Sequence, residues 1–502
     1  MMRTPPRNPE KIAPEPRSKP CGRRGFLQTS SIGVGSLALR HLLQTDGLLA
    51  SSGKLQAQPG GADQESRRGH FDAPAKSVIM LVQTGGPSQM DLFDPKPELQ
   101  KRSGQRHVEQ VEAFQPGSQD NTLLGSPFQF KKHGNSGMEF SELLPHIGSI
   151  ADDLCLVRSM YSENNNHPQA TRCLNTGKIF PHRPALGSWI TYALGTENQN
   201  LPAYVVLRDP DGYANGGTTL WDNGWLPAMF RGTEIQSRGA AVLNLHPTEQ
   251  QPPGVQENNL KLLAELNEQR RALYPLNNEL EARIRNYELA ARMQQSAQQI
   301  LDLSGETEAT GRLYGLDNPT TENYGTRCLM ARRMVESGVR FVQVLVPVKI
   351  GGMPWDQHSN LQGGLKAICP MIDQPTAGLI KDLKQRGLLE STIVIWSGEF
   401  GRLPISQHGN GRDHNRNAFS LLLAGGGFQQ GYVHGATDDL GYRAAESRVG
   451  CPDLHATLLH QLGLDHTALY FPHAGREETL TDPEVTGARV ISTLLQNPVR
   501  IG

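Results

Sequence analysis

The sequence has no excess of charge of either sign. Its 49 lysine and arginine residues nearly balance its 50 aspartate and glutamate residues, and the formal net charge is −1. Proteins that bind nucleic acid through its phosphates carry a basic excess, usually gathered on one face. We therefore expect no nucleic acid among the partners of this chain.

Cysteine is also scarce, with six residues in a chain of 502, and no two of them form a Cys-x-x-Cys pair. The absence of such a pair argues against a zinc site built from thiolates. Cys21 lies near the N-terminus, and the other five are too widely spaced for a disulfide pairing to be assigned from the sequence. Several lie inside apolar runs, where we expect buried thiols.

Long hydrophobic runs are missing as well. A weakly apolar segment of nine residues, Ser31 to Leu39, follows the paired Arg23 and Arg24, whereas a membrane-spanning helix needs about 20 residues. This pattern is typical of a twin-arginine signal, although an ordinary basic tail is the alternative. We predict a tail and signal over residues 1–50, a linker over 51–70, recognition by the twin-arginine export machinery, and a periplasmic or extracellular protein without a membrane span in its mature form.

Glycine (53 residues) and proline (34 residues) are frequent, which indicates many turns and long loops. Between them lie short apolar runs that read as strands covered by helices on both faces; they are residues 77–82, 154–157, 203–207, 339–346, 392–396 and 419–424. Helical patterns alternate with them at 260–273, 276–291, 369–387 and 454–462. The regular part of the third is expected to begin only at Pro375.

Alternation of strands and helices predicts an α/β fold with a doubly wound, mostly parallel sheet. We expect a single domain over residues 71–498. The polar stretch around 208–256 has few strand signals, so it is predicted to be an insertion over one edge of the sheet.

Polar side chains cluster just after the predicted strands, where ligands bind in open α/β sheets. Carboxylate and imidazole groups in these positions form a candidate metal-ligating set: Asp91, His167, Asp356, His358, Glu399, Asp413 and His414. This ligand chemistry suits Zn²⁺ or Mn²⁺, and also Ca²⁺ or Mg²⁺ if oxygens dominate. For Asp91 a turn role is an equal alternative, and Arg402 is expected either to pair with a carboxylate or to bind a phosphate or sulfate oxygen.

Many ordered motifs from about residue 70 to the C-terminus, among them GGPSQMDLFDPKPEL, WDQH, GEFGRLP, GRDHN and DLHATLLHQLGLDH, resemble those of an exported, sulfatase-like bacterial family known as domain of unknown function 1501 (DUF1501). That family is similar to the alkaline-phosphatase superfamily, whose members hydrolyse phosphate or sulfate esters with one or two metals. The resemblance implies an alkaline-phosphatase-like fold with long loop insertions.

The resemblance carries over only part of the family's set of functional residues. At the place where sulfatases have the Cys or Ser that becomes formylglycine stands His167, so formylglycine chemistry is not expected. The usual Asp pair after the first strand is replaced by Gln83-Thr84, and a later Asp-His pair by Gly398-Glu399. Asp356 with His358 and the pair Asp413-His414 keep the family pattern.

The leading hypothesis is a metal-dependent hydrolase of small-molecule or saccharide esters of phosphate or sulfate. In this hypothesis Arg402 holds the anion. The attacking group is His167, a metal-activated water, or a hydroxyl such as that of Thr84 or Thr171. The alternatives are an exported ligand-binding protein that keeps the fold without turnover, and a purely structural protein.

Overall fold

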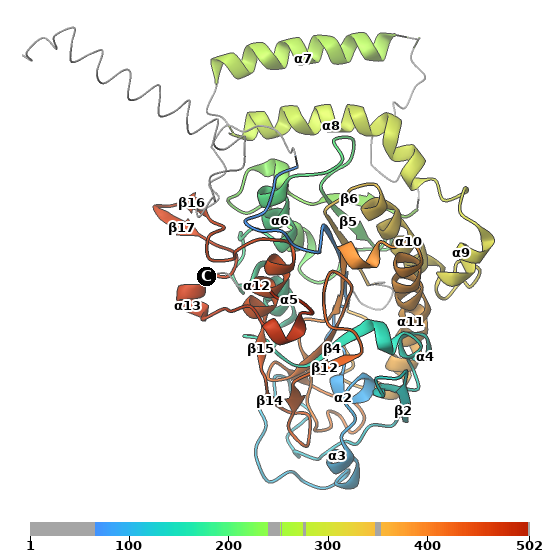
Figure 1. The fold of residues 1–502 in the computed structure, drawn as a ribbon. Coiled ribbons are helices and arrows are strands. Elements are labelled where there is room, and N and C mark those ends of the chain that lie inside the picture. The colour runs from blue at the N-terminus through green and yellow to red at the C-terminus, as the bar shows by residue number, and fades with distance from the viewer. Residues whose placement is uncertain (1–65, 239–251, 253, 275–277, 347–352, 500–502) are drawn as a thin grey trace, which may run out of the picture. The chain divides into compact units, whose positions relative to one another are not determined.

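The computed structural model describes residues 66–238, 252, 254–274, 278–346 and 353–499 (Figure 1). By internal contacts the chain divides into residues 1–53 and 54–502, and all described residues belong to the second unit. The predicted export signal and residues 51–65 of the predicted linker lie outside the described residues, so both stay predictions. Among the described helices, none combines the length and apolar character that a membrane crossing requires.

One nine-stranded sheet organises the unit. Its strands run in the order β12 (Tyr432–His434), β4 (Leu154–Tyr161), β11 (Phe419–Ala424), β8 (Thr392–Ser397), β1 (Ser77–Val82), β7 (Phe341–Leu345), β5 (Tyr204–Arg208) and β6 (Thr233–Gln236), and β15 (Val449–Gly450) also pairs with β4. Every pairing is parallel except those of β11 with β8 and β4. All six predicted strands are in this sheet, and the predicted doubly wound, mostly parallel fold is confirmed.

Helices cover both faces of the sheet, and alternate residues of each strand point to opposite faces. Ile79 and Leu81 of β1 pack in one core with α4 (Pro145–Gly148), α10 (Glu322–Glu336) and α11 (Leu361–Gln385). Val78 and Met80 pack in a second core with α5 (His167–Thr176), α6 (Leu186–Leu194) and α12 (Cys451–Gln461). This two-sided burial explains why the strands are continuously apolar. As expected, the five cysteines of the described part are buried free thiols.

Further helices and strand pairs surround this framework. They are α2 (Gln89–Leu92), α3 (Pro97–Lys101), α7 (Val255–Leu273), α8 (Asn278–Leu301), α9 (Glu308–Leu313), α13 (Pro483–Thr486), and the antiparallel pairs β2 (Phe130–His133) with β3 (Met138–Ser141), β9 (Gly401–Arg402) with β10 (His414–Asn415), β13 (Ala436–Thr437) with β14 (Ala444–Glu446), and β16 (Phe471–His473) with β17 (Arg476–Glu478). The β9–β10 pair directly follows β8 and carries part of the site described below.

One local expectation was wrong. Helix α11 begins at Leu361 and continues through Pro370 and Pro375; a proline removes one intrahelical hydrogen bond, and burial of the helix against α10 and the sheet outweighs that loss. The predicted insertion also contains an edge strand, β6, in which only Ile235 is buried. A four-residue edge strand with one apolar contact leaves too little pattern to be recognised.

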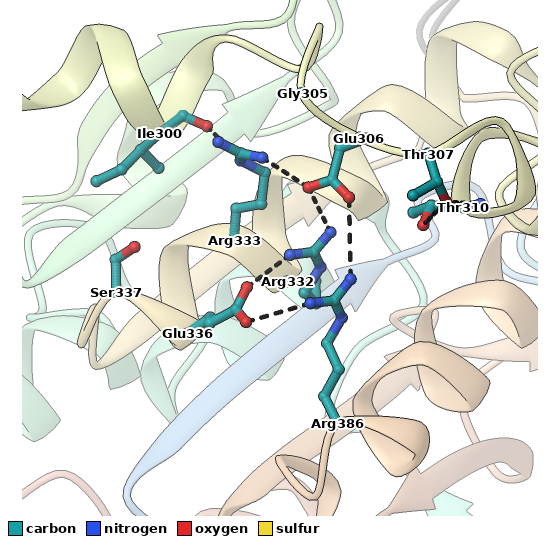
Figure 2. Close-up of a pocket in the computed structure, with 10 residues that line it drawn as sticks. All are labelled: Ile300, Gly305, Glu306, Thr307, Thr310, Arg332, Arg333, Glu336, Ser337 and Arg386. Atoms are coloured by element: carbon teal, nitrogen blue, oxygen red, sulfur yellow. Dashed lines mark hydrogen bonds and ion pairs between the residues drawn. The ribbon is translucent and has the colours of Figure 1, made fainter.

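A cavity of about 390 Å³ lies between α10, the end of α11 and the segment that joins α8 to α9 (Figure 2). Three guanidinium groups face it, and all are paired with carboxylates. Arg332 lies 2.6 Å from Glu306 and 2.5 Å from Glu336, Arg333 lies 2.6 Å from Glu306, and Arg386 lies 2.7 Å from Asp382 and 3.3 Å from Glu336. Because each positive charge is matched, this network fastens the helices together rather than offering an anion site.

A fully buried ion pair fixes the strand ends beneath the candidate site. Arg327 of α10 lies 3.1 Å from Asp209, just after β5, and both side chains are 0% exposed. Arg327 also donates to the carbonyl of Leu345, the last residue of β7, at 2.5 Å. Burial lowers the pKa of Arg327 and the Asp209 carboxylate opposes that shift, so the pair joins a helix to two strand ends.

We predict that Asp209→Ala lowers the free energy of unfolding by about 3–5 kcal/mol, because it leaves a buried guanidinium without its carboxylate. The double variant Asp209→Leu/Arg327→Met is expected to lose less, since both charges are removed together. Urea denaturation followed by circular dichroism measures both. A single variant that loses less than about 1 kcal/mol, as exposed ion pairs do, would contradict this role.

Candidate metal centre

The carboxyl ends of the parallel strands bring the polar segments together at one edge of the sheet. Gly85 follows β1, His167 follows β4, Asp356 follows β7, and Glu399 follows β8. In open α/β sheets this edge is where ligands bind. The segments are distant in sequence but adjacent in space, because β1 pairs with both β7 and β8.

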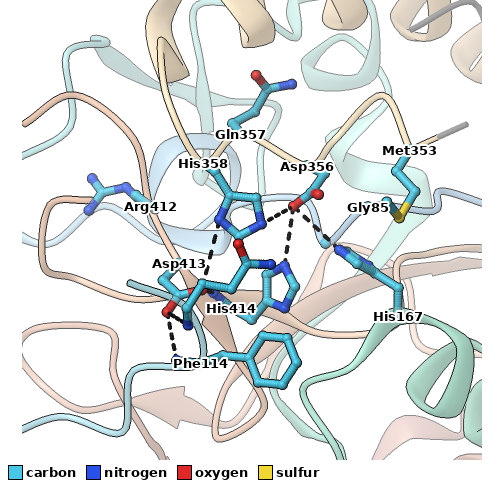
Figure 3. Close-up of polar contacts among 12 residues, drawn as sticks. Gly85, Phe114, His167, Met353, Asp356, Gln357, His358, Arg412, Asp413 and His414 are labelled. Atoms are coloured by element: carbon cyan, nitrogen blue, oxygen red, sulfur yellow. Dashed lines mark hydrogen bonds and ion pairs between the residues drawn. The ribbon is translucent and has the colours of Figure 1, made fainter. Parts of the chain in front are cut away.

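Three imidazoles converge on one carboxylate oxygen (Figure 3). Oδ1 of Asp356 lies 3.3 Å from Nε2 of His167 and 3.0 Å from Nε2 of His358. Nε2 of His414 lies 3.2 Å from the same oxygen. Each of the four residues offers one ligand atom, and these atoms all lie within 4.8 Å of one another. The arrangement is compact enough for all four to contact one ion.

His167 is held from behind by a carboxylate. Its Nδ1 lies 2.6 Å from Oε1 of Glu399. The backbone N–H of Gly85 donates to the same oxygen at 2.9 Å, and that of Gly86 donates to Oε2 of Glu399 at 3.4 Å. The positive φ angles of these two glycines, 116° and 70°, form the turn that aims both N–H groups at Glu399. Nδ1–H therefore donates to Glu399, and Nε2 faces Asp356.

The other two imidazoles are oriented in the same way by neutral acceptors. Nδ1 of His414 donates to the carbonyl of Asn165 at 2.6 Å. Nδ1 of His358 lies 2.6 Å from Oε1 of Gln407, whose amide nitrogen donates to the carbonyl of Pro116 at 2.8 Å. That second bond fixes which end of the amide faces the imidazole. In a neutral ring the other nitrogen, Nε2, is then an acceptor.

Electrostatics of the cluster keep Asp356 ionised. Burial pushes the pKa of Asp356 up, but contacts with His167, His358 and His414, and then the charge of Arg402, hold it well below its usual range. Burial lowers the pKa of His414 to about 3, so its imidazole is neutral at neutral pH. Burial also lowers the pKa of His167, but Asp356 and Glu399 outweigh it and raise that pKa.

Two Nε2 atoms, those of His167 and His358, are buried without a hydrogen-bond partner of acceptable geometry in the described part of the chain. Buried polar atoms are nearly always satisfied in native proteins, so these two nitrogens indicate a partner that takes up the imidazole lone pair. A metal ion bound by imidazole nitrogens meets that requirement. The side chains of His358 and Asp356 retain 20% and 16% exposure, so the cluster is open on that side.

Local folding explains how each imidazole reaches the cluster. His167 begins α5 with Pro168 next to it, a favourable first-turn residue, and Asn166 as the extended N-cap. The β9–β10 hairpin pairs His414 with Arg402 and so returns the second segment to the end of β8. Trp355 donates from its indole nitrogen to Gln83, just past the end of β1, at 3.1 Å and anchors the segment that carries Asp356 and His358.

The structure separates the predicted ligands into two groups. It brings Asp356, His358 and His414 together with His167, which was predicted both as a candidate ligand and as an attacking group. Glu399 and Asp413 lie outside the cluster, and each contacts a residue that belongs to it. Asp413 is fully buried and accepts from the backbone N–H groups of Phe114 at 2.6 Å, Gln115 at 2.7 Å and His414 at 2.8 Å.

Asp91 does not join the cluster. Its carboxylate accepts a two-pronged ion pair from Arg412, at 2.7 Å and 3.2 Å, and a hydrogen bond from Ser88. All three side chains are buried. The structure thus gives Asp91 a structural partner in place of a metal, which corresponds to the turn role that the sequence left open.

Arg402 and Thr171 are engaged by the protein itself. The Arg402 guanidinium donates to the carbonyls of Gly86 at 2.8 Å and Trp355 at 3.1 Å, and to Asp356 at 2.7 Å. The Thr171 hydroxyl donates to the carbonyl of His167 in its own helix at 2.7 Å. Of the predicted roles of Arg402, the structure therefore displays pairing with a carboxylate.

Sequence reasoning missed the residues that orient the imidazoles. Gln407 carries no motif, and its role depends on its distance from His358 in space. Asn165 acts through its backbone carbonyl, which no side-chain pattern can reveal. Phe400 and Phe114 were also missed; their rings lie 4.6 Å and 5.0 Å from the ring of His414 and exclude water from its sides.

Several solved structures share the α/β arrangement at low similarity. The phosphonate monoester hydrolase SpPMH from Silicibacter pomeroyi is 11% identical, with 83% of this chain and 78% of that chain covered and a TM-score of 0.34. The PsFucS1 sulfatase from Pseudoalteromonas sp. is 13% identical, with 81% of this chain and 74% of that chain covered and a TM-score of 0.33. A protein in the alkaline phosphatase superfamily from Vibrio parahaemolyticus is 10% identical, with 84% of this chain and 74% of that chain covered and a TM-score of 0.35. TM-scores of this size are too low to assign an activity to this chain.

A family comparison gives a firmer result. No match was found among curated proteins. The family described as "Protein of unknown function (DUF1501)" matches residues 75–495, a range that includes the whole sheet, the three imidazoles and Asp356. The chain therefore belongs to the DUF1501 family.

Proposed function

We propose that this chain is a metal-dependent hydrolase of phosphate or sulfate esters, with the metal held by His167, Asp356, His358 and His414. The observation that carries the proposal is the common orientation of the three imidazoles. Each has Nδ1 bonded to a fixed acceptor and Nε2 turned toward Asp356. Metal-binding histidines are typically oriented by such an outer hydrogen bond.

The donor set favours zinc among the candidate metals. Three imidazole nitrogens and one carboxylate oxygen suit Zn²⁺ and related transition metals, whereas Ca²⁺ and Mg²⁺ prefer sites made almost wholly of oxygen. Structural zinc sites are closed, while catalytic ones keep a position open to water or substrate. The exposed side of Asp356 and His358 supports the catalytic kind.

A divalent metal in this site would supply Lewis acidity toward an ester oxygen and toward water. The residues of the chain prepare that site. Glu399 fixes the ring of His167, and Arg402 holds Asp356 in place while Asp356 stays ionised. Thr84 keeps a buried hydroxyl with no hydrogen-bond partner in the described part of the chain, so it is a candidate nucleophile alongside water.

Substrate recognition has to differ from the predicted anion clamp. Arg402 is 0% exposed and its nitrogens are engaged by backbone carbonyls and Asp356. Its charge therefore acts through Asp356, and in our proposal a metal held by the four cluster residues would supply the charge that attracts the ester oxygen. Export and a saccharide or small-molecule ester as substrate stay part of the proposal.

A second candidate function is metal-dependent ligand binding without turnover. The engagement of Arg402 favours it, because no other described cationic side chain contacts the four cluster residues. The two candidates share the metal site and differ only in whether an ester is cleaved.

We expect the purified chain to bind one zinc ion per molecule. His358→Ala and His414→Ala should each lose the zinc ion, because each variant keeps only three of the four proposed ligand atoms. His408→Ala is the matched control, since His408 is an exposed histidine of the same segment outside the cluster. Elemental analysis and calorimetric titration of the metal-free protein measure this; retention of zinc by both cluster variants would rule out the proposed ligands.

Glu399→Gln tests the orientation argument. The amide cannot accept from His167, Gly85 and Gly86 as a carboxylate does, so we predict about 10–100-fold weaker zinc binding, as for outer partners of metal ligands. Asp91→Asn should leave zinc affinity unchanged, because Asp91 bonds Arg412 instead. Titration of both variants, each checked for folding by circular dichroism, would contradict the argument if Asp91→Asn weakened zinc binding as much as Glu399→Gln did.

Turnover is tested with aryl phosphate and aryl sulfate esters. The zinc-loaded chain should release the phenol at least about 100-fold faster than the metal-free chain, and His414→Ala should match the metal-free rate. Zinc bound at full stoichiometry without cleavage of either ester would favour the binding protein. A chain that binds no metal would exclude both functions.

A further inference from the structure

Helix α7 (Val255–Leu273) presents an unusual surface. Its 19 residues include no buried one, although it runs alongside α8 (Figure 1). Its partly buried residues, which include Leu263 and Asn267, lie on one side. A helix of this length derives its stability mainly from packing, and α7 has much apolar surface left over.

That surface is a stripe of four aliphatic residues. Val255, Leu262, Leu266 and Leu273 are spaced 7, 4 and 7 residues apart, so at about 100° per residue they point within about 20° of one direction. Their exposures are 37%, 56%, 52% and 74%. This spacing is the seam of a two-helix coiled coil, and it lies on a different side from Leu263.

The stripe matches itself when two copies run antiparallel. Val255 and Leu273 are equally far from Ala264, and so are Leu262 and Leu266. A twofold axis opposite Ala264 therefore places Val255 against Leu273 of the other copy and Leu262 against Leu266. Such a twofold contact uses the same patch on both chains and closes on itself.

The polar positions of the stripe obey the same symmetry. Asn259 and Gln269, the two amides within the stripe, are also equally far from Ala264 and face each other across the pair. Polar residues within the seam of a helix pair fix its register.

We propose that the α7 stripe is a docking surface for a second copy of this chain, which binds through an antiparallel α7–α7 pair about a twofold axis. The apolar residues supply the buried seam, and the amides fix the register. The dimer is independent of the metal site, because none of the cluster residues lies on α7 or α8.

The first test is the mass of the full chain in solution. Sedimentation between about 1 and 100 μM, the range in which weak association is populated, should show the mass doubling with concentration. Leu262→Glu should weaken the dimer at least tenfold. Leu260→Glu is the matched control: Leu260 is 37% exposed on the same helix but points about 140° from Val255. A monomer throughout, or equal losses in the two variants, would overturn the proposal.

Orientation is tested by cross-linking. In a Cys21→Ser background, Val255→Cys should cross-link to Leu273→Cys of another chain and not to itself, because the ends of α7 are about 27 Å apart. Self-cross-linking of Val255→Cys would contradict the antiparallel arrangement. Binding of a monomer to phosphatidylglycerol vesicles that is lost in Leu262→Glu would assign the stripe to a membrane surface instead of a second copy.

Discussion

One carboxylate oxygen organises the candidate site. Oδ1 of Asp356 lies within 3.3 Å of three imidazole nitrogens and 2.7 Å of the Arg402 guanidinium. With Nδ1 of each ring bonded to its own acceptor, the Nε2 atoms that face this oxygen are themselves acceptors, and two of them lack a satisfactory hydrogen bond. A metal among these groups would remove the conflict, because the imidazole lone pairs and the carboxylate would then all face a cation.

The sheet makes that convergence possible. Parallel strands end at the same edge, so four segments spread along the chain between Gly85 and Glu399 meet there. Strand positions were predictable because burial on both faces leaves continuous apolar runs, as in β1 and β8. The edge strand β6 and the continuation of α11 through Pro370 were not, because each depends on tertiary packing rather than on local pattern.

The candidate site, like the fold, was predictable only in part. Residue type and position after strands selected Asp356, His358, His414 and His167, all of which meet in space. The same rule also selected Asp91, because an aspartate after a strand reads alike whether it faces a metal or Arg412. Gln407 and the carbonyl of Asn165 carry no such signal, since their importance follows from the path of loops that the sequence does not specify.

Arg402 shows why geometry decides between roles that the sequence leaves equal. An arginine near an ester site is an obvious anion clamp, but a clamp needs donors that point outward. Here the guanidinium is buried and spans Gly86, Trp355 and Asp356, which belong to segments after two different strands. It thus ties together the loops that carry the ligands and neutralises part of the charge of Asp356. In the proposed hydrolase an anion would therefore be recognised by the metal and the backbone, and selectivity for phosphate or sulfate would rest on coordination chemistry more than on a cationic pocket.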